Sequence, residues 1–227
     1  MSQSITRGQF IVIEGGEGVG KSTNSAFIRE YLSQKGIDFI HTREPGGTPL
    51  AEEIRELLIS TRDESVSPMA ELLLIFAARA QHLEQVILPA LERGQWVISD
   101  RFIDATYVYQ GAARGLGDDA ISTLEQLVLS EFKADQVIVL DADLSVSQAR
   151  ARNRGALDRF EQEPSTFHQC VRDAYLSRAE NDPSRYLVVD ASQSLDVVQA
   201  SLIKLLDGYI ASYRLSVPQS NNTSGSS

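Results

Sequence analysis

Five short apolar runs recur along the chain, separated by longer segments in which apolar residues have helical spacing. The runs cover residues 10–14, 38–42, 96–100, 135–141 and 185–190. They are rich in valine and isoleucine, which is typical of strands buried on both faces of a sheet. The helical pattern covers residues 23–35, 49–60, 68–92, 118–132, 145–154, 165–181 and 195–215. Strands that alternate with helices predict an α/β fold with a mainly parallel sheet.

The pattern continues without an internal repeat or a linker, so we expect a single domain over residues 1–215. Residues 216–227 are rich in serine and asparagine and offer few apolar side chains. Such a segment cannot bury enough apolar area to offset the entropy lost on folding. We therefore expect a disordered tail at residues 216–227.

Composition and charge narrow the class of protein. No apolar stretch reaches the ~20 residues of a membrane helix, and residues 1–9 are too short and polar for a secretory signal, so we expect no membrane contact. Cys170 is the only cysteine, which excludes an intrachain disulfide and fits the reducing cytoplasm. The formal net charge of −10 argues against a nucleic-acid partner.

The first predicted strand leads directly into a segment with the pattern G-x-x-x-x-G-K-[ST], the phosphate-binding loop. Glycines let backbone N–H groups turn toward phosphate oxygens, and the following helix adds the positive end of its dipole. Lys21 can reach the terminal phosphates of ATP, and the Ser22 hydroxyl can bind Mg²⁺. The residues expected to contact these phosphates are Gly15, Gly16, Glu17, Gly18, Val19, Gly20, Lys21, Ser22 and Thr23.

Two further charged segments follow the second and third predicted strands, where ligands bind in open α/β sheets. In the first, TREPGGT at 42–48, Arg43 could grip a second phosphate with its planar guanidinium, although a solvated arginine in a Pro-Gly turn is the alternative. In the second, SDRF at 99–102, Asp100 could hold Mg²⁺ and Arg101 adds positive charge. The alternative for this pair is a helix cap with a surface ion pair.

A cluster of arginines lies at residues 150–163 around Gly155. It contains Arg150, Arg152, Arg154 and Arg159. A charged segment beside a glycine suits a lid that closes over phosphates and excludes water. A solvated basic helix end is the alternative.

Taken together, these residues resemble the thymidylate kinase family. The matching pieces occur in order: the phosphate loop preceded by Glu14, TREPGGT at 42–48, DRF at 100–102, TYVYQG at 106–111 and RGALDRFE at 154–161. The phosphate loop alone is generic, whereas TREPGGT together with DRF and YQG is specific. The resemblance implies a P-loop NTPase-type three-layer fold, with a five-stranded parallel sheet flanked by helices. It also implies a homodimer, formed partly through residues 68–92.

The activity that the resemblance implies is transfer of the γ-phosphoryl of ATP to dTMP, with Mg²⁺, to give dTDP and ADP in dTTP synthesis. Arg43 and Arg101 would grip the dTMP phosphate, and Arg79 would bind the thymine, whose edge Thr106 and Gln110 would read. The residues implied in dTMP binding are Glu14, Arg43, Phe76, Arg79, Arg101, Thr106, Tyr109 and Gln110.

Phosphoryl transfer requires positioning and charge neutralisation more than covalent chemistry. Arg154, beside Gly155, is our candidate for the contact with the transferring phosphate. The loop positions 16–19 contain no arginine, which resembles the bacterial subtype with lid arginines. Tyr109 would press against the sugar where a ribose carries its 2′-hydroxyl. The expected catalytic groups are Lys21, Arg101, Arg154 and Glu14, with Mg²⁺ on Ser22 and Asp100.

One position departs from the family. The phenylalanine that stacks on thymine usually lies four residues before the base-reading arginine, but Phe76 lies three residues before Arg79, and Ile75 lies four before it. Either Phe76 rotates into this role, which we expect, or the base packs on Ile75.

The rival functions are a kinase for another monophosphate such as dUMP, dGMP or dCMP, a phosphate-loop switch or partition ATPase, and a nucleotide-binding scaffold without turnover.

Overall fold

The structure is a computed structural model that describes residues 6–152 and 159–216. Within these ranges five parallel strands form one sheet in the order β2-β3-β1-β4-β5. The strands are β1 (Phe10–Glu14), β2 (Phe39–Arg43), β3 (Trp96–Asp100), β4 (Gln136–Asp141) and β5 (Tyr186–Asp190). The α/β fold with a five-stranded parallel sheet, predicted from the sequence, is confirmed.

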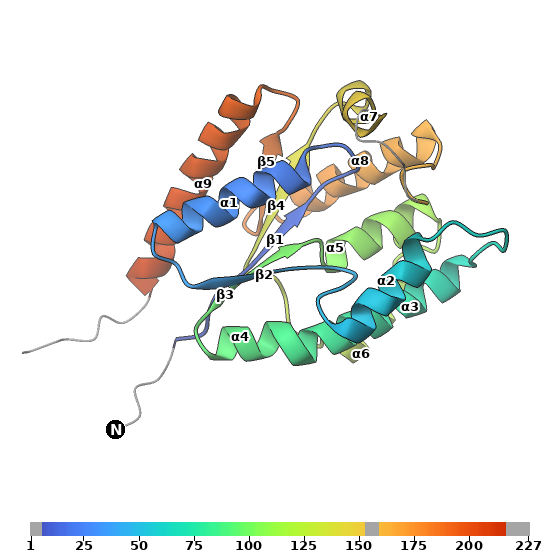
Figure 1. Ribbon diagram of the computed structural model, residues 1–227, viewed down its shortest axis with the longest axis horizontal. Coiled ribbons are helices and arrows are strands. Elements are labelled where there is room, and N and C mark those ends of the chain that lie inside the picture. Colours follow the sequence, from blue (N-terminus) through green and yellow to red (C-terminus); the bar gives the residue numbers. More distant parts are fainter. Residues whose placement is uncertain (1–5, 153–158, 217–227) are drawn as a thin grey trace, which may run out of the picture.

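Helices cover both faces of the sheet, which gives three layers (Figure 1). They are α1 (Lys21–Gln34), α2 (Pro49–Ile59), α3 (Pro68–His82), α4 (Leu88–Glu92), α5 (Ile103–Thr106), α6 (Asp119–Val128), α7 (Leu144–Arg152), α8 (Ser165–Asn181) and α9 (Leu195–Ser216), with π-helical turns η1 (Leu83–Ile87) and η2 (Tyr107–Ala113). Helices α1 and α9 pack on one face, whereas α3, α4, α6 and α8 pack on the other. Helix α2 lies outside α3.

The central strand shows why the apolar runs lack a polar face. Phe10 and Val12 of β1 point into the core beneath α3 and α4, whereas Ile11 and Ile13 point into the core beneath α1 and α9. All four side chains are fully buried. Burial of each stabilises the fold by about 1.5–3 kcal/mol, so a strand between two helical layers is apolar throughout.

The segment 68–92 differs from the continuous helix that the sequence predicts. Ser67 caps its start by accepting a hydrogen bond from the Ala70 N–H at 3.2 Å, with Pro68 in the first turn. The α-helix then ends at His82, and the π-helical turn η1 precedes α4. Pro89 has no N–H, and in a regular α-helix its ring would clash with the carbonyl four residues earlier. The wider turn accommodates the proline without ending the helical path.

The single tryptophan, Trp96, lies at the start of β3 under α9. Its ring makes edge-on contacts with Tyr209, at 5.7 Å between centroids, and with Tyr213, at 5.1 Å. Helix α9 continues to Ser216, one residue beyond the predicted end, whereas residues 217–227 of the predicted tail lie outside the described part. None of the helices described here combines the length and apolar composition that crossing a bilayer requires.

Candidate active site

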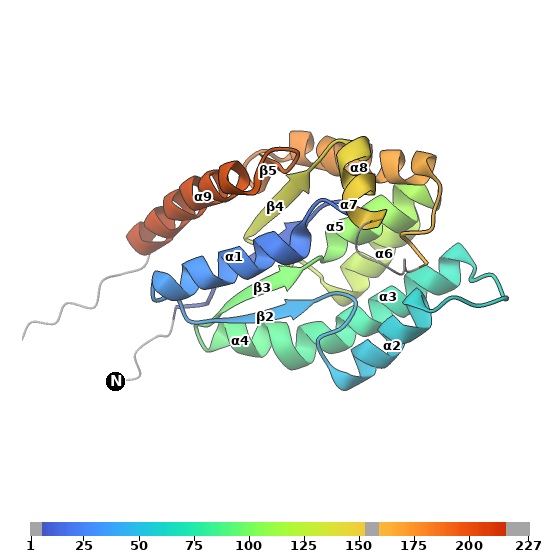
Figure 2. The same cartoon turned by 45° about the horizontal axis from the view of Figure 1, so that its top comes forward.

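The sequence motifs meet at the carboxyl edge of the sheet because all five strands run in the same direction (Figure 2). Arg43 at the end of β2 is in register with Asp100 at the end of β3. Asp100 is in turn in register with Ile13 of β1, directly before Glu14 and the phosphate loop. This edge is where open α/β sheets bind their ligands.

The phosphate loop has a backbone that only glycine allows at two positions. Gly15 and Gly18 have φ values of 136° and 73°, and a Cβ atom would lie 2.4 Å from the carbonyl oxygen of Leu140 and 2.0 Å from that of Ser147, respectively. The Lys21 ammonium donates to the carbonyl oxygens of Gly15 and Gly16 at 3.0 and 2.6 Å. Burial, assisted by the positive charge of Arg101, lowers the Lys21 pKa to about 8.

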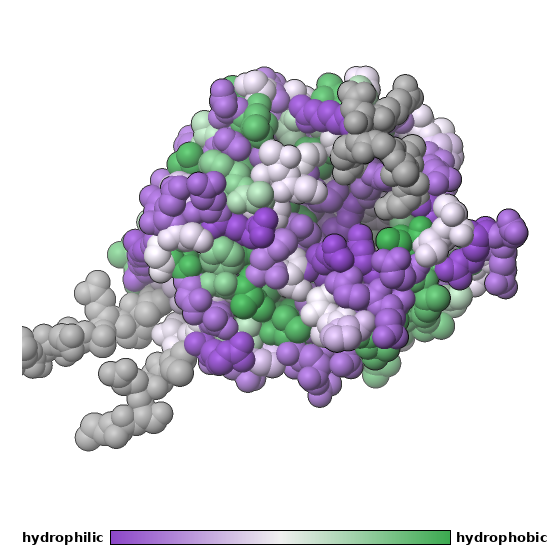
Figure 3. Space-filling view, in the orientation of Figure 1, coloured by the Kyte–Doolittle hydropathy of each residue, from purple (hydrophilic) through white to green (hydrophobic). Residues whose placement is uncertain are grey.

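A cleft of about 730 Å³ opens between the phosphate loop and the α2–α3 pair, a size typical of ligand sites. Hydrophilic side chains gather around a hollow on this face of the molecule (Figure 3). The cleft brings together residues from each predicted motif, namely Glu17, Gly18, Gly20, Lys21, Ser22, Thr23, Arg43, Arg79, Asp100, Arg101, Thr106, Tyr109 and Gln110. Of the remaining loop residues, Gly15, Gly16 and Val19 line a second cavity.

Arg101 is held rigidly at the centre of the cleft. Its Nη1 donates to the Gly15 carbonyl oxygen at 3.1 Å and to the Tyr175 hydroxyl at 3.0 Å. Its Nη2 donates to the Tyr109 hydroxyl at 3.0 Å and to the Glu17 carboxylate. The backbone of Arg101 has a φ of 69°, which is rare outside glycine and is concentrated at functional sites. The guanidinium is therefore positioned beside the phosphate loop before a ligand binds.

Arg79 of α3 is almost fully buried, with 1% of its surface exposed. Its Nε donates to Glu44 at 2.8 Å, and its Nη2 donates to the Phe102 carbonyl oxygen at 3.1 Å and to the Thr106 hydroxyl at 2.9 Å. The buried Nη1 has no hydrogen-bond partner among the described residues. Because buried donors are nearly always satisfied, this N–H is available for an acceptor on a ligand.

Gln110, the other candidate base reader, is tied to a second buried carboxylate. Its side-chain nitrogen donates to Glu71 of α3 at 2.7 Å. Glu71 also accepts from Arg159 and forms an ion pair with Arg114 at 3.6 Å. These contacts connect α3, η2 and the C-terminal part of the predicted lid, to which Arg159 belongs.

Asp100 has the character of a cation ligand. Although burial opposes its ionisation, hydrogen bonds from His41 and Ser25 hold the Asp100 pKa below its usual value. Its Oδ2 lies 3.4 Å from His41 Nε2, whereas the buried Oδ1 has no partner among the described residues. The Ser22 hydroxyl belongs to the same cleft. An ionised carboxylate oxygen and a hydroxyl are ligands that suit Mg²⁺.

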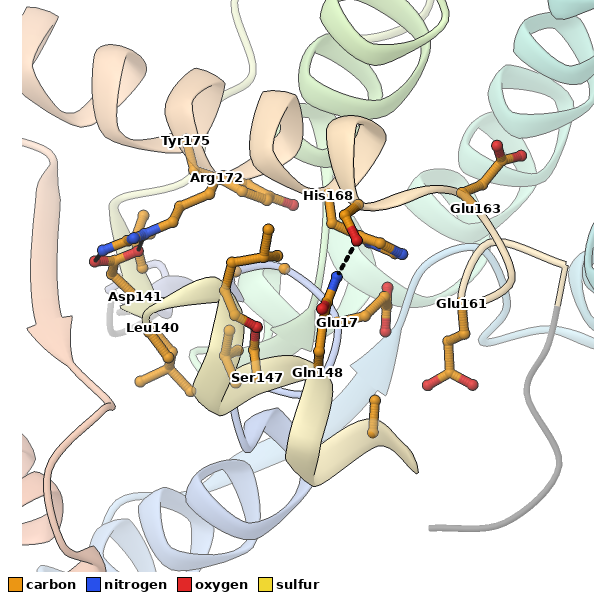
Figure 4. Close-up of a pocket in the computed structure, with 18 of the residues that line it drawn as sticks. Glu17, Leu140, Asp141, Ser147, Gln148, Glu161, Glu163, His168, Arg172 and Tyr175 are labelled. Carbon is orange, nitrogen blue, oxygen red and sulfur yellow. Dashed lines mark hydrogen bonds and ion pairs between the residues drawn. The ribbon is translucent and has the colours of Figure 1, made fainter. Parts of the chain in front are cut away.

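The second cavity, of about 400 Å³, lies on the other side of the phosphate loop between α7 and α8 (Figure 4). An ion pair crosses one wall, where the Arg172 guanidinium donates to both oxygens of Asp141 at 2.7 and 2.9 Å. Glu17 and Tyr175 line this cavity and also hold Arg101, so they form part of the wall between the two cavities.

Comparison with known proteins decides the family. A family model described as thymidylate kinase matches residues 13–202. The chain belongs to the thymidylate kinase family. A thymidylate kinase of Hahella chejuensis is 56% identical over 205 residues, which cover 90% of this chain and 99% of that protein. One of Teredinibacter turnerae is 54% identical over 203 residues, 89% and 99% of the two chains. One of a Marinomonas species is 56% identical over 199 residues, 86% and 92%.

Glu14 lies deeper than we expected for a thymidylate kinase residue in contact with the substrate. It is fully buried and is not among the residues that line the cleft. Its carboxylate accepts from the Phe102 N–H at 2.9 Å and from the Tyr175 hydroxyl at 2.7 Å. Burial is the main cause that raises its pKa, to about 7. In this structure Glu14 holds the backbone that follows β3.

Ile75, rather than the expected Phe76, lines the cleft. Phe76 packs in the core, and its ring centroid lies 4.9 Å from the guanidinium carbon of Arg79. Neighbouring residues of an α-helix point about 100° apart, so the two side chains do not share a face. Arg154 lies outside the described residues, whereas Arg150 lines the cleft and donates to the Ala191 carbonyl oxygen at 2.7 Å.

Sequence reasoning missed the side chains that orient the candidate ligand-binding groups. Glu44 belongs to the TREPGGT motif, so the sequence indicated that it lies near the site. The motif did not indicate its contact with Arg79. The fully buried His82 is hydrogen-bonded to both sides of this motif. Its Nδ1 lies 3.0 Å from a Glu44 carboxylate oxygen, and its Nε2 lies 2.6 Å from the Thr42 hydroxyl. Glu71 had no local signal at all.

Proposed function

We infer that the protein is a dTMP kinase that transfers the γ-phosphoryl of ATP to dTMP and yields dTDP and ADP. Membership of the thymidylate kinase family supports this activity. The single observation that carries it in the structure is the buried, unpartnered Nη1 of Arg79 in a cleft shared with the phosphate loop. The Arg79 donor suits a base carbonyl at one end of the cleft, and the phosphate loop suits phosphates at the other end.

On the ATP side, the phosphate loop and Lys21 would bind the β- and γ-phosphates through backbone N–H groups and an ammonium. Ser22 and Asp100 would hold Mg²⁺, because one oxygen of Asp100 is buried without a partner among the described residues. When bound, Mg²⁺ supplies positive charge to the oxygens of the transferring phosphate.

On the dTMP side, Arg43 and Arg101 would bind the phosphate, and Tyr109 would pack on the sugar. Arg43 is half exposed and donates to Glu52 at 2.8 Å, so its guanidinium can exchange this partner for a phosphate. The thymine would pack on Ile75 and be read by Arg79, Thr106 and Gln110. The attacking phosphate oxygen of dTMP is already ionised, so the reaction needs no strong general base.

The remaining parts of the proposal rest on the sequence. Arg154 would contact the transferring phosphate from a lid at residues 150–163, as in the bacterial subtype, within a single domain that spans residues 1–215. A homodimer would form through the face of α3 and α6, which pack together. The exposed side chains of Met69, Leu73 and Leu127 on these helices support this surface.

The test is release of ADP from ATP and Mg²⁺ with each of dTMP, dUMP, dGMP, dCMP and AMP as the acceptor. We expect strong turnover with dTMP, well ahead of dUMP. Faster turnover with another monophosphate would preserve the mechanism but remove the base-reading roles of Arg79, Thr106 and Gln110. A rate of ADP release that does not depend on any added monophosphate would instead favour a switch ATPase.

A further inference from the structure

The orientation of one amide in the base site is fixed by a carboxylate behind it. Gln110 lines the cleft, and 2% of its surface is exposed. Its side-chain nitrogen lies 2.7 Å from Oε1 of Glu71, which is 1% exposed. An amide can present either a donor or an acceptor, and its neighbours determine which.

Glu71 can only accept hydrogen bonds in its ionised form. Two arginines balance its charge: Arg159 donates to Oε2, and Arg114 lies 3.6 Å from Oε1. An acceptor-only neighbour requires the NH₂ of Gln110 to face α3, because the opposite orientation would bring two buried oxygens together. The carbonyl oxygen of Gln110, to which no described residue donates, is then the amide atom that remains for the cleft.

Arg79 presents the opposite polarity to the same cleft. Glu44 fixes its Nε, and the Phe102 and Thr106 oxygens fix its Nη2, so Nη1 remains as a donor. The base site thus offers one donor and one acceptor. Thymine and uracil carry the complementary pair, a carbonyl at position 4 beside an N–H at position 3. Cytosine carries the reverse, an amino group beside a bare ring nitrogen.

We propose that Glu71 is a specificity-determining positioning residue, which locks the Gln110 amide with its oxygen toward the base and so makes the site reject cytosine. This inference rests on the proposed function as a dTMP kinase. A cytosine base would place donor against donor and acceptor against acceptor in a buried site, which leaves polar groups unpaired. Discrimination of dTMP from dUMP does not involve this edge and is independent of Glu71.

The decisive variant is Glu71→Gln, whose amide lets Gln110 adopt either orientation. We expect the ratio of kcat/KM for dTMP over dCMP to fall about tenfold or more, the effect of roughly one buried hydrogen-bond mismatch. The ratio for dTMP over dUMP should stay within about twofold, since both bases share the same edge. Equal changes in both ratios, or no change in the first, would overturn the proposal.

Glu163→Gln is the matched control. Glu163 forms an ion pair with the same Arg114, at 2.6 Å, but no hydrogen bond or ion pair joins it to Gln110. The Glu163→Gln substitution removes one negative charge beside Arg114, as Glu71→Gln does, but leaves the partner of the Gln110 amide in place. We therefore expect both ratios to stay at their wild-type values. A fall in the dTMP over dCMP ratio in this control would assign the effect to charge alone and overturn the role of the amide.

The exchanged pair Glu71→Gln with Gln110→Glu provides a rescue with unchanged net charge. A carboxylate at position 110 can only accept, so rejection of dCMP should return. If Glu71→Gln alone does not fold in a thermal melt, this pair is compared with Gln110→Met, which should accept dCMP more readily than the pair does. Equal ratios in those two variants would contradict the proposal.

The two hypotheses fail in different ways. A wild-type protein without ADP release that depends on dTMP would remove the proposed function. An active wild type with an unchanged dTMP over dCMP ratio in Glu71→Gln would remove only the role of Glu71.

Discussion

Burial shifts the pKa values of two groups at the carboxyl edge of the sheet toward physiological pH. The pKa of Lys21 falls to about 8, and that of Glu14 rises to about 7, in both cases chiefly through loss of solvation. Burial disfavours the charged form of either group, so it shifts a lysine and a glutamate in opposite directions. Both groups therefore titrate near physiological pH, where their protonation can be measured.

For Lys21 we expect ATP binding to the free protein to weaken as pH rises from about 7 to about 9.5, because the neutral amine no longer attracts phosphates. An exposed lysine would lose its proton only near pH ~10.4. Calorimetric titration of ATP across this range measures the effect. Lys21→Arg stays charged throughout, so its profile should be flat. A flat profile for the wild type as well would contradict the lowered pKa.

For Glu14 the pKa predicts a pH-dependent stability. The folded-state value of about 7 exceeds the ordinary 4.5, so the folded protein retains a proton that the unfolded chain releases between these values. The resulting stability is fully present below pH 4.5 and is lost as pH rises through 7. Relative to Glu14→Gln, the wild-type free energy of unfolding should fall by up to about 3 kcal/mol between pH 4.5 and 8. Urea unfolding of both proteins tests this, and a constant difference would refute it.

Among the elements, those with one dominant apolar period were predictable. The strands β1 and β3 start and end where the apolar runs do, because a strand buried on both faces needs no polar position. The helical segment Ile103–Ala113 was not predicted. It mixes β-branched and aromatic residues with Gly111, and it changes from α5 to the π-helical η2, so no single period describes it.

The contacts between elements were the part of the site that the sequence could not supply. The family motifs indicated Arg79 and Gln110, but the carboxylates that orient them lie 35 and 39 residues away. Only the packing of α3 against η2 and the end of β2 brings these pairs together. The choice between Phe76 and Ile75 likewise depends on how α3 is rotated about its axis, which the sequence does not specify.

The prediction for catalysis concerns Arg154, which follows α7 in the sequence. Arg154→Ala should lower kcat about 10³–10⁵-fold, as loss of a transition-state arginine does in phosphate-loop enzymes, and leave the KM for dTMP nearly unchanged. Arg93→Ala, an exposed arginine at the opposite edge of the sheet, serves as the control. Steady-state kinetics separates the two constants. An unchanged kcat would exclude Arg154 from the reaction.

At the scale of the whole molecule, the proposed homodimer depends on the exposed apolar face of α3 and α6. Leu73 is 51% exposed there. Leu73→Glu should shift the protein from dimer to monomer in sedimentation velocity, because burying an unpaired carboxylate at an interface is costly. Leu195→Glu on α9, which is similarly exposed at 47%, should leave the dimer intact. A dimer that persists in Leu73→Glu would place the interface elsewhere.

The position of Trp96 gives the molecule a built-in optical probe. It is the only tryptophan in the chain and lies at the end of β3 opposite Asp100, packed between the sheet and two tyrosines of α9. Its emission therefore reports whether α9 is seated on the sheet, while events at the phosphate loop occur at the other end of the strand. A red shift on heating or in urea marks the opening of this one helical layer, and comparison with loss of enzymatic turnover shows whether the two ends of the sheet unfold together.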